Sequence, residues 1–506
     1  MKKTLVALAT AAVALTGCGI QDDSASTGAA HTLRLVTVYP ANTTDPHMVQ
    51  TAFILNSGTV ETLVKLDIKT GTLSPGLATA WTQKGNTWQL TIRDGVTFHN
   101  GKALTAQVVQ QNIERAISKN PGVKALLPIA SMKADGQTLT ITTTKPYAGL
   151  MSEFVHFNTA IIDPEAGIEK PIGTGPFKFD SFTTTGAAEL SRFDGYWDGR
   201  ARLERATMTA NQDANARLLA LQSGEADVIY RPSTETLDGL KKDDRYTVET
   251  RTGTRVYHLL FNFKGPQAEL WGKQDFRQGI DALLDRRAIA KTVMSGYGEA
   301  TDNPFAGKTA VSPGQVTRPS GKEAALRYFQ RAGLEVSNGK VTSKGKPLTM
   351  NIVTYVARPE LPQIAQVMEN SASQVGITFK IVTADNIDEH LTSKEWDVAT
   401  YSANTVTRGD GSYFIHGSLT PGGAQNHGQL DDPALNKLID RFNSAPDATQ
   451  RASVARQLGV TVRDRQLNSY LVAPMETAAF AKGVTGWQTP SNEFEYPMIT
   501  KDLDRG

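Results

Sequence analysis

The sequence predicts a mixed α/β protein with more than one lobe, and three observations support this. Segments that alternate between polar and apolar residues, as strands do, are interleaved with segments of helical spacing. A complete β-α-β unit is recognisable at residues 348–384. The chain has 506 residues, and the ~475 that follow an N-terminal leader exceed what one hydrophobic core usually serves. We therefore expect an α/β fold with mixed sheets and at least two lobes.

The first half of the chain alternates between strands and helices. Residues 32–39 alternate as a strand, and residues 48–64 have helical spacing. Residues 88–101 predict two short strands around an Asp-Gly turn, and residues 130–144 predict a second strand pair. Between these pairs, Thr105 is a good N-cap for a helix that begins at the next residue.

The β-α-β unit lies in the second half of the chain. Residues 348–355 and 377–384 have strand character, and residues 361–376 between them have helical spacing. Gly376 stands where a helix C-terminus commonly requires a glycine. This arrangement is typical of two parallel strands joined by a helix.

The N-terminus has the layout of a secretory signal. Lys2 and Lys3 precede an uncharged apolar run at residues 5–15, which is shorter than the ~20 residues that a membrane span needs. The run ends in Leu15-Thr16-Gly17-Cys18, which resembles a bacterial lipobox and contains the single cysteine of the chain. The resemblance implies a lipoprotein signal peptide at residues 1–17 and lipidation at Cys18. Several acyl chains would hold the protein on a membrane where one would not.

Composition narrows the possible partners. Removal of the signal leaves 51 basic and 51 acidic residues, and no Lys/Arg run occurs. This balance argues against nucleic acid and against a polybasic membrane patch. Residues 18–30 are small, polar and free of aromatic residues, a composition typical of a flexible tether. We therefore expect membrane contact through lipid alone.

Several short segments together resemble one family. They follow one another along the mature chain as residues 61–64, 73–81, 90–101, 171–177, 196–199, 224–227, 276–280 and 284–286. In this order they resemble the large solute-binding proteins of peptide and nickel ABC importers, family 5 of the extracellular solute-binding proteins. Most of these residues are interpreted as determinants of the fold, because they are turn glycines and prolines, apolar anchors and scaffold arginines.

The resemblance implies a two-lobe fold of the type II periplasmic-binding-protein kind, in its large cluster, with a hinge between the lobes. The first lobe would comprise residues 31–255, completed by residues 480–506, with an extra subdomain inserted at about residues 58–172. The second lobe would comprise residues 256–479. Such a protein closes on a solute and delivers it to permease subunits that are driven by ATPases. We expect it to act as a monomer on the outer face of the cell membrane.

Catalytic motifs are missing from the sequence. It contains no G-x-S-x-G elbow, no H-E-x-x-H pair and no phosphate-binding G-x-x-x-x-G-K-[ST] loop. Its 8 histidines are scattered without metal-ligand spacing. We therefore expect a binding protein without a cofactor, and a lipid-anchored hydrolase stays the alternative from another class.

Residues 354–362, TYVARPELP, bear on the choice of solute. They are similar to a segment typical of the subgroup that binds nickel and opine-type metallophores. We interpret them as a strand end and helix start, a subgroup marker more than a ligand contact. One departure stands against a simple nickel chelate, because residues 156–159 lack an arginine that the nickel subgroup often carries there.

Residues 396–416 resemble the strand and cleft loop that bring an Asp to the ligand's ammonium group in peptide binders. The match puts Thr407 or Arg408 near that Asp position. A guanidinium group repels an ammonium but can hold a carboxylate in a bidentate fork. We therefore predict that Arg408 binds an anionic solute. His416 is a candidate metal ligand, since neutral imidazole suits nickel and its neighbours, although a hydrogen-bonded loop histidine is the simpler interpretation.

Further candidates for the cleft come from loops and strand ends. The resemblance places five such residues near the solute, namely Tyr39, His47, Tyr257, Tyr401 and Tyr413. The predicted solute is a metal chelate, of nickel or of an opine-type metallophore, in which any metal belongs to the transported ligand. An oligopeptide or dipeptide is the alternative within the same family.

Overall fold

The computed structural model describes residues 32–506 except 185, 308, 317 and 394. The predicted signal peptide, Cys18 and the tether lie outside the described residues. Within the described part of the chain, no helix combines the length and the apolar character needed to cross a membrane.

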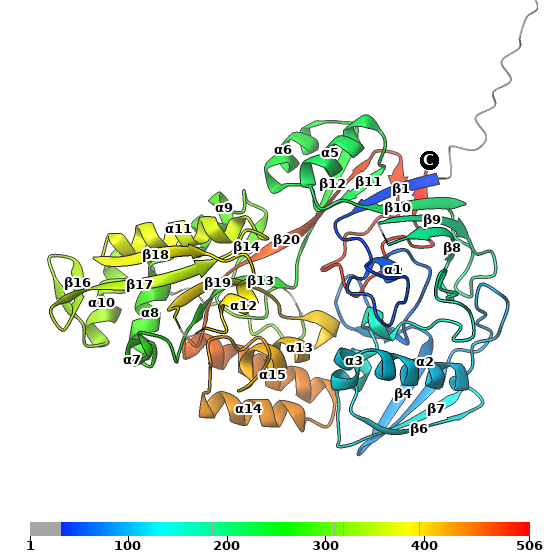
Figure 1. Cartoon of the computed structure of the whole chain (residues 1–506), viewed down its shortest axis with the longest axis horizontal. Helices are drawn as coiled ribbons and strands as arrows, with labels where there is room; N and C mark the ends of the chain where they lie inside the picture. Colours follow the sequence, from blue (N-terminus) through cyan, green and yellow to red (C-terminus); the bar gives the residue numbers. More distant parts are fainter. Residues whose placement is uncertain (1–31, 185, 308, 317, 394) are drawn as a thin grey trace, which may run out of the picture.

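Two lobes lie side by side and are joined by long strands (Figure 1). One sheet runs through both lobes in the order β15-β16-β17-β19-β13-β20-β11-β1-β10-β9-β8, with β12 and β14 also paired to β20 and β18 paired to β17. Strand β20 (Ser469–Ala481) pairs through its first half with β13 (Arg255–Phe261) and through its second half with β12 (Tyr246–Thr252). The predicted mixed α/β class with two lobes is confirmed.

The first lobe surrounds one end of this sheet. Leu33 and Leu35 of β1 are buried in its core, as the alternating pattern requires. Its remaining elements are α1 (Phe53–Asn56), β8 (Phe177–Thr183), β9 (Ala187–Arg192), β10 (Arg205–Ala210), α5 (Ala214–Ser223), β11 (Val228–Tyr230) and α6 (Thr234–Lys242), after β1 (Thr32–Thr37).

A separate four-stranded sheet, in the order β4-β5-β7-β6, forms a subdomain inserted into the first lobe. Its helix begins at the predicted cap, where the Thr105 hydroxyl accepts a hydrogen bond from Val108 N. The subdomain's elements are β2 (Val64–Leu66), β3 (Leu73–Pro75), β4 (Ala78–Lys84), β5 (Thr87–Ile92), α2 (Ala106–Lys119), α3 (Pro121–Leu126), β6 (Ile129–Asp135), β7 (Thr138–Thr143), α4 (Leu150–Glu153) and a 3-10 turn η1 (Phe157–Thr159).

The second lobe contains the predicted β-α-β unit, in which β17 (Lys346–Thr354) and β18 (Ile377–Thr383) pair in parallel around α11 (Glu360–Ser373). Gly376 has a φ of 83°, which favours glycine. The other elements are α7 (Ala268–Trp271), α8 (Gln274–Ala282), α9 (Arg286–Thr292), β14 (Gly298–Ala300), α10 (Lys322–Arg331), β15 (Glu335–Ser337), β16 (Lys340–Ser343), α12 (Ile387–His390), β19 (Val398–Asn404), η2 (Thr407–Gly409), α13 (Ser412–Phe414), the π-helix η3 (Ile415–Leu419), α14 (Pro433–Asn443) and α15 (Ala448–Asp464). The chain ends with β21 (Val484–Thr485) and β22 (Asp504–Arg505), which pair back in the first lobe.

Two local predictions were wrong. Residues 48–64 form only the four-residue helix α1, because Gly58 turns the chain with a φ of 69° and lies against the C-terminal segment. A Cβ at Gly58 would lie 2.1 Å from Ile499 O. The second strand expected within residues 88–101 is reduced to an isolated bridge between Thr97 and Ala103. At residues 48–64 a tertiary contact thus overrides the local pattern.

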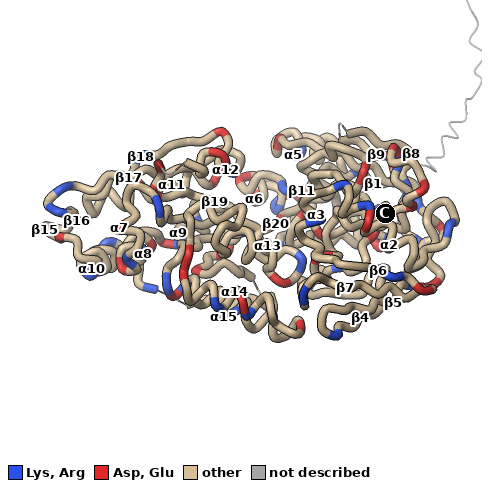
Figure 2. The backbone as a smooth tube through the Cα atoms, turned by 60° about the horizontal axis from the view of Figure 1, so that its bottom comes forward, with Lys and Arg blue, Asp and Glu red and all other residues tan. Residues whose placement is uncertain are grey.

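Charged residues are distributed over both lobes. Figure 2 shows Lys/Arg and Asp/Glu positions interspersed along the tube, without a large face of one sign. This distribution agrees with the near-zero charge of the mature sequence.

Candidate functional site

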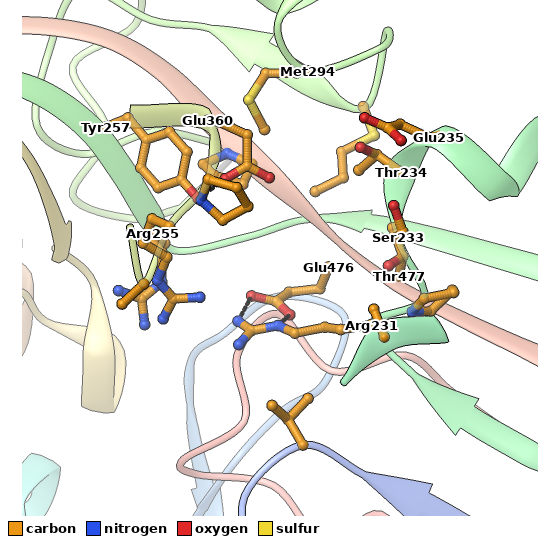
Figure 3. A pocket seen from close by; sticks show the side chains of 18 of the residues that line it. Arg231, Ser233, Thr234, Glu235, Arg255, Tyr257, Met294, Glu360, Glu476 and Thr477 are labelled. Carbon is orange, nitrogen blue, oxygen red and sulfur yellow. Dashed lines mark hydrogen bonds and ion pairs between the residues drawn. The ribbon is translucent and has the colours of Figure 1, made fainter. Parts of the chain in front are cut away.

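A cavity of about 320 Å³ lies between the two lobes (Figure 3). The first lobe contributes residues 231–235, and the second lobe contributes residues 357–360 at the start of α11. Strands β13 and β20, which connect the two lobes, contribute Arg255, Tyr257 and residues 474–477. The volume is at the low end of the ~300–1,000 Å³ that is typical of small-molecule sites.

Arg231 follows β11 and is fixed by two carboxylates. Its Nε and Nη2 donate to Glu476 at 2.7 and 2.5 Å, and its Nη1 and Nη2 donate to Glu493 at 3.1 and 3.0 Å. The backbone of Arg231 adopts a φ of 54°, which is uncommon for a residue with a side chain. The paired carboxylates therefore hold this guanidinium in one orientation, and Figure 3 shows the Glu476 interaction.

Arg255 begins β13 and has incomplete pairing. Its Nη1 donates to Ser402 Oγ at 3.0 Å, and its Nη2 lies 3.6 Å from Glu493 Oε1. Its Nε is buried without a hydrogen-bond partner among the described residues. Burial, followed by the positive charge of Arg358, lowers the pKa of Arg255 below its usual value. Two neighbouring guanidinium groups therefore repel each other at this end of the cavity.

Arg358 lies two residues before α11 and lines the same cavity. No hydrogen bond or ion pair joins its guanidinium group to any residue that the structure describes. The carboxylate that follows it, Glu360, accepts a hydrogen bond from Tyr257 Oη at 3.2 Å. Arg358 thus presents a cationic fork with free donors to whatever occupies the cavity.

Glu493 shows how strongly this region favours an anion. Its burial would raise the pKa, but the charges of Arg231, Arg255 and Arg358 lower it to about 2. The arginines of the lining are Arg217, Arg231, Arg255 and Arg358, and its carboxylates are Glu235, Glu360 and Glu476, with Glu493 against Arg231. The charges are balanced in number, so the case for an anion rests on the donors of Arg255 and Arg358 that no carboxylate pairs directly. A ligand carboxylate between Arg255 and Arg358 would complete the pairing with charge-assisted hydrogen bonds.

The cavity lining offers little for direct metal binding. Among the described residues, no group of three or more His, Cys, Asp or Glu side chains is arranged to hold a metal ion. The neutral part of the lining includes the aromatic side chains Tyr39 and Tyr257 and the thioethers of Met294 and Met475. A metal in this cavity would therefore need to bring its own ligands.

Of the residues predicted from the sequence to bind solute, Tyr39 and Tyr257 line this cavity. Tyr401, Tyr413 and Thr407 are not part of the lining. Tyr401 is buried and donates to Asp388 Oδ1 at 2.5 Å, and Tyr413 accepts a hydrogen bond from Gln425 at 3.1 Å. Solute contacts for Tyr39 and Tyr257 remain a prediction.

The structure places Arg408 in a contact between the lobes and outside the cavity lining. Its Nη1 donates to Glu153 Oε2 at 2.5 Å, and both side chains are buried. Glu153 ends α4 of the inserted subdomain, whereas Arg408 lies in η2 of the second lobe. A counter-charge from the other lobe therefore already pairs with the guanidinium group that we assigned to the solute, through Nη1 alone, while Nε is buried without a hydrogen-bond partner among the described residues.

The two candidate histidines are also engaged within the fold. Buried His47 contacts Ala160 O through Nε2 at 2.9 Å and Arg115 Nη1 through Nδ1 at 2.7 Å. His416 Nε2 lies 2.7 Å from Asn443 Oδ1, within the second lobe. Neither histidine is part of the cavity lining. His416 therefore makes the kind of hydrogen bond that the simpler interpretation expected. Among the described residues, no metal-ligand cluster includes either histidine.

Sequence reasoning missed the arginines of the cavity. Arg358 lies within the TYVARPELP segment, which we interpreted as a subgroup marker. Its position just before a proline and a helix start could have indicated an exposed side chain at a loop end. Arg231 and Arg255 had no comparable sequence pattern, because distant strands bring them together.

Comparison with known proteins identifies the class. The model of the bacterial extracellular solute-binding proteins, family 5, matches residues 72–426. The chain therefore belongs to this family.

Three relatives are informative. A crystallised nickel ABC transporter protein from Bacillus halodurans is 35% identical, with a TM-score of 0.85 over 94% of this chain and 100% of that one. The nickel-binding protein NikA of Staphylococcus aureus is 28% identical over 93% of this chain and 92% of its own length. The oligopeptide-binding protein AppA of Bacillus subtilis is 24% identical over 80% of this chain and 78% of its own length.

Proposed function

We propose that this protein is the lipid-anchored receptor of an ABC importer and captures a small metal chelate, of nickel or of an opine-type metallophore. The carboxylates of the chelate would bind the arginines of the cavity. The observation that carries the proposal is Arg358, a cation in the interlobe cavity whose guanidinium group has no hydrogen bond or ion pair with any described residue. Free donors in a partly desolvated cavity match a carboxylate-bearing ligand.

The lack of a described metal-ligand cluster supports a chelate over a bare ion. A chelator supplies the donor atoms for the metal, and its remaining carboxylate oxygens can contact Arg255 and Arg358. The similarity to nickel-binding relatives supports the same solute class, since a solved complex of S. aureus NikA, 26% identical to this chain, contains nickel with two L-histidines.

Calorimetric titration tests this proposal. We expect nickel mixed with L-histidine to bind the protein, and nickel alone or L-histidine alone to bind much more weakly. Tight binding of metal-free oligopeptides, with no response to nickel chelates, would replace the chelate by the peptide alternative. That alternative draws support from the oligopeptide-binding relative, but the small cavity favours a compact ligand.

Anchoring at Cys18 is part of the proposal and has its own test. Radiolabelled palmitate should be incorporated into the wild-type protein and lost in Cys18→Ser. Labelling that persists in the variant would remove the anchor from the proposal. We further propose that the receptor acts as a monomer without catalysis, and turnover of ester or peptide substrates by the purified protein would support the hydrolase alternative instead.

A further inference from the structure

A second cavity lies where the inserted subdomain, the β12–β13 connection and the second lobe meet. Its volume is about 330 Å³, similar to that of the cavity described above. Most of the lining comes from the β2–β3 turn, from residues 251–254 at the end of β12 and in the turn to β13, and from residues 306, 307 and 309 of the second lobe. The two cavities share no lining residue.

Donor groups in this second cavity lack partners. Arg251 Nη1 donates to Ile68 O at 2.5 Å, but its Nε is buried without a hydrogen-bond partner among the described residues. Thr309 Oγ1 is buried and unpartnered in the same sense. The hydroxyl oxygen of Tyr496 accepts a hydrogen bond from Ser491 Oγ at 3.3 Å, so its own proton is free to be donated.

The charges of the lining point to an anion. Arg251 and Lys69 contribute two positive charges, and Glu299 is the single carboxylate among the lining residues described. A buried guanidinium N–H without an acceptor is costly, and an oxyanion satisfies it. A cation would meet Arg251, and an apolar molecule would leave the donors unpaired.

We propose that this second cavity binds a small oxyanion, either a carboxylate or a phosphate, through Arg251, Thr309 and Tyr496. Because both lobes contribute to the lining, the affinity for the anion depends on the angle between the lobes. A solute that closes the lobes changes that angle and so changes the affinity for the anion. By thermodynamic linkage, the anion changes the affinity for the solute by the same factor. The cavity is thus a regulatory site that is separate from the solute site.

The experiment titrates metal-free protein with inorganic phosphate and, separately, with citrate. Binding of one or both at millimolar concentration supports the site and distinguishes the two sources of oxyanion. We expect Arg251→Gln to weaken that binding by about 10-fold or more, as for a lost charged hydrogen bond. Thr309→Val keeps the shape of the side chain and should weaken binding by roughly 3-fold.

Arg358→Gln is the matched control, since it removes a guanidinium from the other cavity. Oxyanion binding that survives Arg358→Gln and is lost in Arg251→Gln supports the second site. The opposite pattern, or no binding of either probe by the wild type, overturns it. Nickel–histidine titration of the same variants separates this proposal from the proposed function, because a failed second site leaves the chelate result unchanged.

Discussion

Two arginines in loops of the second lobe, Arg358 and Arg408, have opposite environments. Arg408 is buried against Glu153 of the first lobe at 2.5 Å, whereas Arg358 faces the interlobe cavity with its donors free. The charge and the local sequence context are similar, but the fold places a carboxylate at hydrogen-bond distance from one guanidinium and, among the described residues, none at that distance from the other. An arginine is thus available to a ligand where it lines a cavity and no carboxylate of the protein is bonded to it.

The largest expected effect breaks the Arg408 side of this comparison. Glu153→Gln leaves a buried guanidinium without its counter-charge, and we expect the free energy of unfolding to fall by about 3–5 kcal/mol. Thermal and denaturant unfolding measure the loss. The double variant Glu153→Gln with Arg408→Met should recover much of it, because no buried charge then remains unpaired. A single variant as stable as wild type would show that the pair does not hold the lobes.

The Arg358 side should respond in binding, not in stability. Arg358→Gln should weaken nickel–histidine binding by about 30-fold or more, equivalent to about 2–5 kcal/mol, without lowering the melting temperature. Arg358→Lys keeps the charge but loses the planar fork, so an intermediate affinity is expected. Exposed Arg200, changed to Gln, is the control. Unchanged affinity in Arg358→Gln would contradict the role of the cavity.

The pH dependence of stability can sharpen the comparison, because Glu495 lies electrostatically close to Arg408. Burial raises the pKa of Glu495 to about 8, above its value of 4.5 when exposed. A carboxyl with a raised folded-state pKa contributes stability below pH 4.5, and this contribution is lost as pH rises towards 8. Glu495→Gln should therefore be relatively more stable than wild type at pH 8.5, by about 1–3 kcal/mol, and similar at pH 4. Parallel unfolding curves at both pH values would refute the assignment.

The smallest effect is expected at His416. His416→Ala removes the contact with Asn443 and should cost about 0.5–1.5 kcal/mol of stability. We expect nickel–histidine affinity to stay within about 2-fold of wild type, since the side chain does not line the cavity. Titration of this variant beside Arg358→Gln checks the contrast. A large loss of metal-dependent binding would restore the metal-ligand prediction.

Much of the fold could be predicted because its signals are local. The Thr105 cap and the β17-α11-β18 unit depend on residue patterns within single segments. The helix expected at residues 48–64 failed because the contact of Gly58 with Ile499 joins segments far apart in the sequence. No local pattern contains that information.

The candidate site was less predictable for the same reason. Tyr39 and Tyr257 could be placed at the cavity from strand ends and the family resemblance. The pairing of Arg408 with Glu153, 255 positions apart, could not be inferred from either segment alone. The same holds for Arg231, whose partners Glu476 and Glu493 lie more than 240 positions away.

The path of β20 constrains the order in which this protein can be made. Both lobes need this strand, because β13 and β14 pair with one half of it while β11 and β12 pair with the other. Synthesis starts at the N-terminus, so residues 469–481 are among the last to be made. Neither part of the long sheet can be complete before they are available. An exported chain would stay incompletely folded during most of its passage, as threading through a narrow secretion channel requires. The last strand to arrive would then complete both lobes together.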